Sequence, residues 1–414
     1  MVSQVAEGQA SVRSGVTAQR RTIIFFSVAV FLYWIALYLY IPTLPAHAKS
    51  KTDSLAMVGT ALSMYGFWQA IVRLPLGIVS DWLGRRKVFI VLGFALAGLG
   101  AYVLGSADSI EGVILGRAIV GVAAGTWVPL VVAFSSLFPP EEAIRASALL
   151  TFIGSIGRVL ATAVTGTLNN LGQRIWGSSN PFSGYPLAYY VAAGAAQLAV
   201  VALLPTTETR RPRKQPSLSS LGRLISRRDV LLPSVLSAVT QYGVWMSTFG
   251  FIPILAADLG ASGVTASLMV SVNIGVQTLA NLAASSLSRR TGARVLVYAG
   301  FVLMALGLAG AALAPTIGAL WAAQLVLGLS QGLAYPVLMG LSIRHVDESQ
   351  RASAMGLHQA VYAIGMFAGP WLGGILAQAI GLRPMFAVTA GALLLFGLLG
   401  ARLMDGRQAE RAAA

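Results

Sequence analysis

Three arginines lie inside strongly apolar stretches of the sequence, where a charged side chain is expensive. They are Arg73, Arg117 and Arg158. An arginine at the centre of a bilayer costs roughly 2.5–3.5 kcal/mol on insertion scales, and a buried charge without a partner is costly. Each of these side chains is therefore expected to face protein or a water-filled cavity. A guanidinium group in a cavity can bind an anionic group of a solute.

No acidic residue is placed to neutralise these arginines. All 14 Asp and Glu residues lie in tails, loops or the ends of apolar stretches. Backbone carbonyls, glutamines and water could supply the missing partners, and so could an anionic group of a substrate. We interpret Arg73 and Arg158 as candidate substrate-binding residues and Arg117 as a structural or gating residue.

Neutral polar side chains recur at helical spacing in the second half of the chain. Asn273, Gln277 and Asn281 are four residues apart and share one helix face. Polar stripes in membrane helices often only bond one helix to another, but several occur here, and we predict a shared binding site. Its other predicted members are Tyr33, Gln241, Trp245, Tyr335, His358, Gln359 and Tyr362.

His358 has two interpretations. Histidine ordinarily titrates at about pH 6.5, so this side chain could carry a coupling proton. It could equally form a hydrogen bond with Tyr362, one helical turn further along.

The composition sets the class of protein. Of the 414 residues, 56% are hydrophobic and 10% are charged, whereas a soluble domain carries about 25% charged residues. The chain is therefore predicted to be an integral membrane protein. It has no cysteine and three scattered histidines, so no metal or other cofactor is expected. The apolar stretches hold no nucleophile or paired carboxylates, and there is no phosphate-binding loop, so neither an enzyme nor an ATP-driven pump is predicted.

The elements that must position these residues are twelve apolar segments, each long enough to cross a bilayer as a helix. Residues 1–21 look disordered and form one tail, 206–229 form a basic linker, and 405–414 form the other tail. We expect an all-α membrane fold with one six-helix bundle over 22–205 and a second over 230–404. The predicted spans are 22–45, 57–81, 88–106, 110–138, 145–169, 185–205, 230–257, 263–287, 293–313, 316–343, 351–380 and 384–404.

The basic residues indicate how the chain is oriented. Of the 29 Lys and Arg residues, 22 lie in the two tails and in the loops on the same side as the tails. Lys49, Lys51, Arg174 and Arg383 are on the other side. Positive charge stays in the cytoplasm, so both termini are predicted to be cytoplasmic, in the inner or plasma membrane. The net charge of +15 is then a topology signal facing anionic lipid, not a nucleic-acid site.

The linker contains apolar residues at helical spacing. Leu218, Leu221, Leu224 and Ile225 recur at helical spacing, with Arg223, Arg227 and Arg228 opposite. This pattern is typical of an amphipathic helix on the inner leaflet, and a flexible tether is the alternative.

The two halves of the chain resemble each other, which indicates an internal repeat. The stretch Tyr40–Leu44 matches Phe251–Leu255 around a shared proline, and Arg145-Ala-Ser repeats from Arg351. Arg117 aligns with Gln324 in the same frame. Five such matches occur in the same order.

The stretch Gly77–Lys87, GIVSDWLGRRK, closely resembles a loop motif of the major facilitator superfamily. Arg117 with Gly121 and Gly125 resembles the fourth-helix motif of that family. The resemblance implies two six-helix bundles in pseudo-twofold repeat, a central cavity and transport by alternating access. It also implies that this loop clamps the bundles together in the outward-open state, where a plain topology-fixing hairpin is the alternative. The residues given gating roles are Gly77, Asp81, Gly84, Arg85, Arg86, Arg117 and Arg145.

We therefore predict a secondary transporter for a small organic, anionic or amphipathic solute. The alternative is a multidrug–proton antiporter of the same superfamily, which the well-formed loop motif favours and the missing membrane carboxylate opposes. A motif like GPWLGG of residues 369–374 occurs in the fifth helix of drug–proton antiporters. Here it lies in the eleventh span. The expected partners are the substrate, the bilayer and a coupling ion such as the proton, and a monomer is expected.

Overall fold

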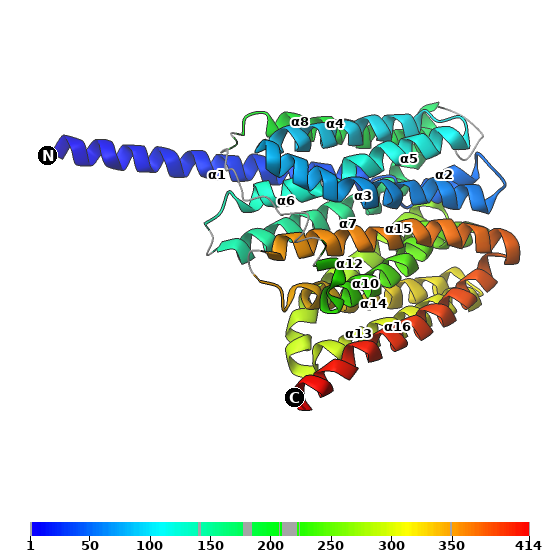
Figure 1. The fold of residues 1–414 in the computed structure, drawn as a ribbon. Coiled ribbons are helices and arrows are strands. Elements are labelled where there is room, and N and C mark those ends of the chain that lie inside the picture. Colours follow the sequence, from blue (N-terminus) through cyan, green and yellow to red (C-terminus); the bar gives the residue numbers. More distant parts are fainter. Residues whose placement is uncertain are drawn as a thin grey trace.

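The computed structural model describes residues 2–139, 142–176, 184–206, 208, 222, 224–347 and 350–413. These residues form two helical bundles, one from each half of the chain, with both termini at the same end (Figure 1). Eleven helices among them are long and apolar enough to cross a membrane. The predicted all-helical membrane fold is thus confirmed.

The first bundle follows the predicted spans closely but contains two breaks. The expected first span ends at Tyr38, and a run of turns through Pro42 leads into a short helix. The expected fourth span breaks at Gly125 and Thr126, where the Thr126 hydroxyl donates to the Ala123 carbonyl at 2.7 Å. Its helices are α1 (Val2–Tyr38), α2 (Leu44–Lys49), α3 (Leu55–Leu83), α4 (Arg86–Gly105), α5 (Ile110–Ala124), α6 (Trp127–Ser135), α7 (Ala143–Trp176) and α8 (Tyr185–Leu203).

The second bundle contains one irregular helix in the predicted span 230–257. A π-helical turn, η2, interrupts it between α10 and α11, and this segment is not among the eleven candidate spans. The helices are α10 (Arg228–Met246), η2 (Ser247–Phe251), α11 (Ile252–Asp258), α12 (Gly263–Thr291), α13 (Ala293–Leu313), α14 (Ile317–Ile343), α15 (Arg351–Ile380) and α16 (Leu382–Ala413).

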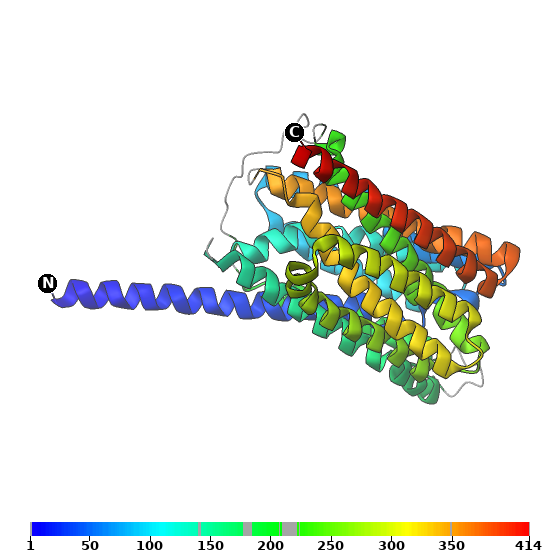
Figure 2. The same ribbon diagram turned by 90° about the horizontal axis from the view of Figure 1, so that it is seen from below.

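The predicted disorder of residues 1–21 is wrong. From Val2 onward these residues continue α1 as one helix that projects well beyond the bundle (Figures 1 and 2). Residues 405–413 likewise extend α16. The first residues are polar, so hydropathy could not distinguish a helical extension from an unstructured tail.

Only part of the predicted amphipathic linker helix can be compared, because residues 207, 209–221 and 223 lie outside the described part. Leu224 is fully buried against Val346 and Leu357. Ile225 is exposed. The Leu224 side chain therefore packs against protein.

The bundles contact each other through α3 with α15 and through α7 with α12. Gly59 makes the closest approach: a Cβ atom added there would lie 2.3 Å from the Pro370 carbonyl oxygen and 2.9 Å from the Gly374 Cα. Near the other end of α3, an added Cβ at Gly356 would lie 3.8 Å from Leu74. The tightest packing of α3 on α15 is therefore at the end away from the chain termini.

An ion pair also joins the bundles at that end. Lys49 Nζ of α2 lies 3.3 Å from the Asp258 carboxylate of α11, and both side chains are partly exposed. The backbone N–H of Leu55 donates to Gln378 Oε1 at 2.7 Å. These contacts hold α2 and α3 of the first bundle against α11 and α15 of the second.

Candidate substrate site between the bundles

Arg158 lies on α7, half-buried, with its guanidinium group over aromatic rings. Its Cζ is 5.1 Å from the centre of the Trp34 ring and 5.7 Å from that of Tyr38, both on α1. Nε donates to the Gly154 carbonyl at 3.3 Å, and a terminal nitrogen donates to the Ser155 hydroxyl at 3.2 Å. All of these partners are neutral, so the positive charge remains available to an anion.

An aromatic cluster runs from this arginine across to the second bundle. It consists of Trp34, Tyr38, Tyr65, Trp127, Trp245 and Phe249. Tyr38 meets Phe249 edge to face at 6.0 Å, and Tyr65 stacks on Trp245 at 5.0 Å. Rings this large bury much apolar area and favour flat, apolar partners. Of its members, only Trp245 was predicted.

Arg73 lies on α3 and is 4% exposed. One terminal nitrogen donates to the Tyr362 hydroxyl of α15 at 2.6 Å, and the other donates to Gln69 Oε1 at 2.5 Å. The Tyr362 contact crosses between the bundles. Tyr335 packs edge to face on Tyr362 at 5.7 Å.

His358 is fully buried in the second bundle beside these tyrosines. Its Nδ1 lies 3.0 Å from the Ser234 hydroxyl. That hydroxyl donates its proton to the Val230 carbonyl at 2.7 Å, so the histidine must be the donor, and the neutral ring carries its proton on Nδ1. Nε2 is left as a buried acceptor that has no hydrogen-bond partner among the described residues. The predicted bond between His358 and Tyr362 is replaced by a ring contact at 6.0 Å.

Several predicted site residues lie elsewhere. Tyr33 is a core residue of the first bundle, stacked on Phe94 at 4.7 Å, with its hydroxyl donating to the Ala123 carbonyl at 3.3 Å. Asn273 Nδ2 donates to the Gln324 backbone carbonyl at 2.7 Å and to Gln324 Oε1 at 2.9 Å. This side chain therefore joins α12 to α14.

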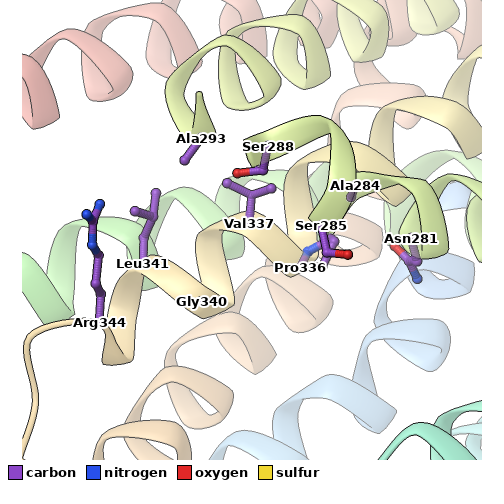
Figure 3. Close-up of a pocket in the computed structure, with 10 residues that line it drawn as sticks. All are labelled: Asn281, Ala284, Ser285, Ser288, Ala293, Pro336, Val337, Gly340, Leu341 and Arg344. Atoms are coloured by element: carbon purple, nitrogen blue, oxygen red, sulfur yellow. The ribbon is translucent and has the colours of Figure 1, made fainter. Parts of the chain in front are cut away.

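The remaining predicted polar residues are buried or half-buried without forming one stripe. Gln241 and Gln277 are each 6% exposed. Gln359 has a buried Oε1 without a hydrogen-bond partner. Asn281 lines a separate cavity between α12 and α14 (Figure 3). The stripe Asn273, Gln277 and Asn281 is thus divided among different surroundings.

Arg117 is 1% exposed and sits on α5, with its Cζ 4.6 Å from the centre of the Tyr65 ring. Its Nε and one terminal nitrogen are buried, and no described residue forms a hydrogen bond with them. Gly121, one turn further on, packs α5 closely on the backbone of α3 at Met64. These contacts support the predicted structural role.

The described side chains include no carboxylate within ion-pair distance of Arg73, Arg117 or Arg158. Ion pairs of the described residues lie instead at the surface, where Glu142 pairs with Arg145 and Asp229 with Arg227 and, at 4.0 Å, with His345.

The predicted gating loop has the left-handed turn that its glycine suggests. Gly84 adopts a φ of +61°, which favours glycine. The backbone N–H groups of Arg86 and Lys87 donate to the Glu208 carboxylate at 2.6 and 3.1 Å. This anion caps the positive N-terminal end of α4.

The other gating residues are placed as follows. Gly77 lets α3 approach α6, since an added Cβ would lie 3.2 Å from Val128. Arg85 is exposed, and Arg145 pairs with Glu142 at 2.9 Å at the surface. The side chain of Asp81 lies outside the described residues. The clamp between the bundles stays a prediction.

The two bundles contact each other through α3 and α15 and through α7 and α12. This arrangement of two similar halves agrees with the sequence comparison. A family model described as the Major Facilitator Superfamily matches residues 26–254 and 234–414. The chain belongs to the major facilitator superfamily. It is therefore a member of a family of membrane transporters.

Relatives cover the transporter to different extents. It is 31% identical over 148 residues to the inner membrane transport protein YajR of Escherichia coli, which is 35% of this chain and 32% of that protein. The chain thus spans about a third of the length of that relative. It is 26% identical over 384 residues to a chloramphenicol efflux pump of Mycobacterium tuberculosis, covering 89% of each protein.

Solved structures share the fold. A bacterial homologue of the lysosomal transporter Spinster, in an inward-facing and occupied conformation, matches with a TM-score of 0.76 at 15% identity, over 95% of this chain and 97% of that one. A mutant of the nucleoside transporter NupG matches with a TM-score of 0.73 at 16% identity, over 92% and 98%. These likenesses establish the fold of the transporter.

Proposed function

We propose that this transporter moves a small organic solute with an anionic group, bound between the bundles at Arg158. The observation that carries the proposal is the half-buried guanidinium group of Arg158, which has only neutral partners and lies over Trp34 and Tyr38. A carboxylate or phosphate can pair with it. The aromatic cluster beside it suits an apolar or flat remainder of the solute.

Arg73 has a different role in this proposal. Its terminal nitrogens are engaged by Tyr362 and Gln69, and it is nearly inaccessible. It therefore holds the bundles together in the state described, and it adds positive potential near Tyr335 to the field that attracts the anion.

Transport into proteoliposomes tests the charge of the solute. We expect uptake of aromatic carboxylates in preference to their neutral amides, and an uptake rate at least tenfold lower for Arg158→Gln, because a hydrogen bond to a charged group contributes about 1.5–3 kcal/mol. Arg174→Gln, which changes an exposed arginine of the same helix, is the matched control and should transport normally. Transport of lipophilic cations alone would refute the proposal.

Proton-coupled drug efflux is the second candidate function. It is favoured by the likeness to a chloramphenicol efflux pump over most of both chains and by the unpartnered Nε2 of His358, which could accept a proton. Under this alternative, an imposed proton gradient drives the uptake of lipophilic drugs, ionophores abolish it, and His358→Gln uncouples it. Absence of any response to the gradient would exclude it.

A further inference from the structure

A cavity of about 280 Å³ lies outside the site described above, between the C-terminal halves of α12 and α14 (Figure 3). Its lining includes polar residues of α12 and Arg344 at the end of α14, but neither Arg73 nor Arg158. The C-terminal ends of α12 and α14 lie at the end of the bundle where the chain termini are (Figure 1).

Several polar groups in this cavity form no hydrogen bond with the described residues. Other serines of α12 donate back to their own helix: Ser267 to the Gly263 carbonyl at 2.7 Å and Ser286 to the Ala283 carbonyl at 2.9 Å. In the described part of the chain, Ser285 and Ser288 form no such bond. Asn281 Oδ1 is buried without a hydrogen-bond partner at the inner end of the cavity. Ser285 is exposed and Ser288 half-buried, so both hydroxyls are accessible to a ligand, whereas an unpaired buried group such as Asn281 Oδ1 is uncommon and calls for an explanation.

The outer end of the cavity is positively charged. Arg344 is exposed, and its guanidinium group makes no hydrogen bond or ion pair with described residues. Arg289 and Arg290 are exposed at the end of α12, and Arg294 follows in α13. Basic pockets between membrane helices at this level attract anionic headgroups.

The surface beside the cavity is apolar. Leu279 and Leu282 of α12 are each 69% exposed, and Leu282 is three residues from Ser285, so the two are neighbours on the helix surface. Val337 and Leu341 of α14 provide apolar walls inside. A ligand here therefore meets a guanidinium group, two hydroxyls and an amide next to a lipid-like surface.

We propose that this cavity binds the headgroup of an anionic phospholipid from the leaflet on the side of the chain termini. Its phosphate oxygens accept from Arg344, Ser285 and Ser288. A headgroup hydroxyl, such as that of phosphatidylglycerol, donates to Asn281 Oδ1. The acyl chains lie against the exposed leucines of α12. This site does not depend on the solute that is transported.

Thermal unfolding of the purified full-length protein in detergent tests the site. Phosphatidylglycerol should raise the unfolding midpoint more than phosphatidylcholine does, and Arg344→Gln should lose at least half of this difference. Arg402→Gln removes an exposed arginine of α16 that does not line the cavity and should keep it. Equal effects of the two lipids, or an unchanged difference in Arg344→Gln, would overturn the proposal.

A second variant guards against a folding defect in the first. A Cβ added at Gly340, which lines the cavity, would have no atom within 4 Å, so Gly340→Leu should fold while filling the cavity. It should also lose the phosphatidylglycerol-specific shift. If soluble glycerol phosphate alone reproduces the full shift in the wild-type protein, the site binds free phosphate esters and the lipid proposal is wrong.

Discussion

Arg73 and Arg158 are alike in the sequence but have different partners in the structure. Arg73 is held by a tyrosine of the opposite bundle, whereas Arg158 is held by its own helix. A cation bonded across an interface stabilises one arrangement of the bundles. A cation bonded to its own helix keeps its position when the bundles move. The second is the better anchor for a solute through a transport cycle.

Removing the Tyr362 hydroxyl tests the role of Arg73. Tyr362→Phe keeps the ring but leaves one nitrogen of a buried guanidinium group unpaired. We expect the free energy of unfolding to fall by about 1.5–3 kcal/mol, measured by thermal or denaturant unfolding. Tyr102→Phe, at an exposed tyrosine of α4, should change little. Equal stability of the two variants would show that the contact is not stabilising.

His47 makes stability depend on pH. It lies on α2, 3% exposed, with Nε2 3.2 Å from the Leu104 carbonyl. Burial, and to a smaller extent the charge of Lys51, lowers its pKa to about 4. In the unfolded chain the pKa of His47 is about 6.5, so between pH 7 and pH 5 the unfolded chain takes up a proton that the folded chain does not. The free energy of unfolding therefore falls by about 2 kcal/mol over this range.

Substituting the histidine should flatten this dependence. His47→Gln can keep a donor for Leu104 and cannot be protonated, whereas His345→Gln changes a half-exposed histidine and should follow the wild type. The measurement is the unfolding midpoint from pH 7 to pH 5. Parallel curves for all three proteins would contradict the assignment.

Helix α3 approaches α15 through glycines, and this contact decides how closely the bundles can meet. Gly59 lies against the backbone of Pro370 and Gly374, and Gly66 lies against that of Met366. Such small-residue faces let membrane helices approach closely. The same pair of helices carries the contact between Arg73 and Tyr362.

A single methyl group at this contact should open the bundles. In Gly59→Ala the added Cβ meets a backbone oxygen at 2.3 Å, whereas Gly194→Ala on α8 meets nothing within 4 Å. The chain has no cysteine, so a pair introduced at Lys49 and Asp258 reports their separation by cross-linking. We expect Gly59→Ala to lower the cross-linking yield and Gly194→Ala to leave it unchanged. Equal yields would mean that the approach of α3 does not control closure.

Hydropathy predicted where the helices lie but not where they break. Most predicted spans agree with the helices to within a few residues, because long apolar runs and basic loops determine them. The break at Thr126 and the π turn at Ser247 depend on local backbone hydrogen bonds, which an average over composition does not detect. For the same reason the polar extension of α1 was missed.

The site was predicted in part. The arginines could be identified because charge is rare in apolar segments. Which face of each helix points toward the site could not be identified. Tyr33 was chosen on α1, whereas its neighbours Trp34 and Tyr38, four residues apart, face Arg158. That spacing was the available signal. Glu208 was missed because the residue that it caps is far away in the sequence.

At the scale of the whole molecule, the bundles are joined at the end away from the termini, by the Lys49–Asp258 ion pair and by α3 and α15. If the termini are cytoplasmic, as the basic loops predict, this state is closed toward the outside. Opening outward then requires separation of that pair and of the Gly59 contact. The loop that contains Gly84 is at the opposite end, where the predicted clamp would act.

The orientation can be tested on cells with single cysteines. We expect a membrane-impermeant thiol reagent added outside to label Lys51→Cys and to leave Arg290→Cys unlabelled until the membrane is permeabilised. The cysteine-free wild type is the background control. The reverse pattern would invert the topology and make the described state closed toward the cytoplasm.

The binding of an organic anion at Arg158 is the central claim, and ligand-dependent stabilisation of the purified protein measures it most directly. We predict that an aromatic carboxylate or phosphate ester raises the unfolding midpoint of the wild type and of Arg174→Gln but not of Arg158→Gln. Undiminished stabilisation of Arg158→Gln by the same anion would contradict the account.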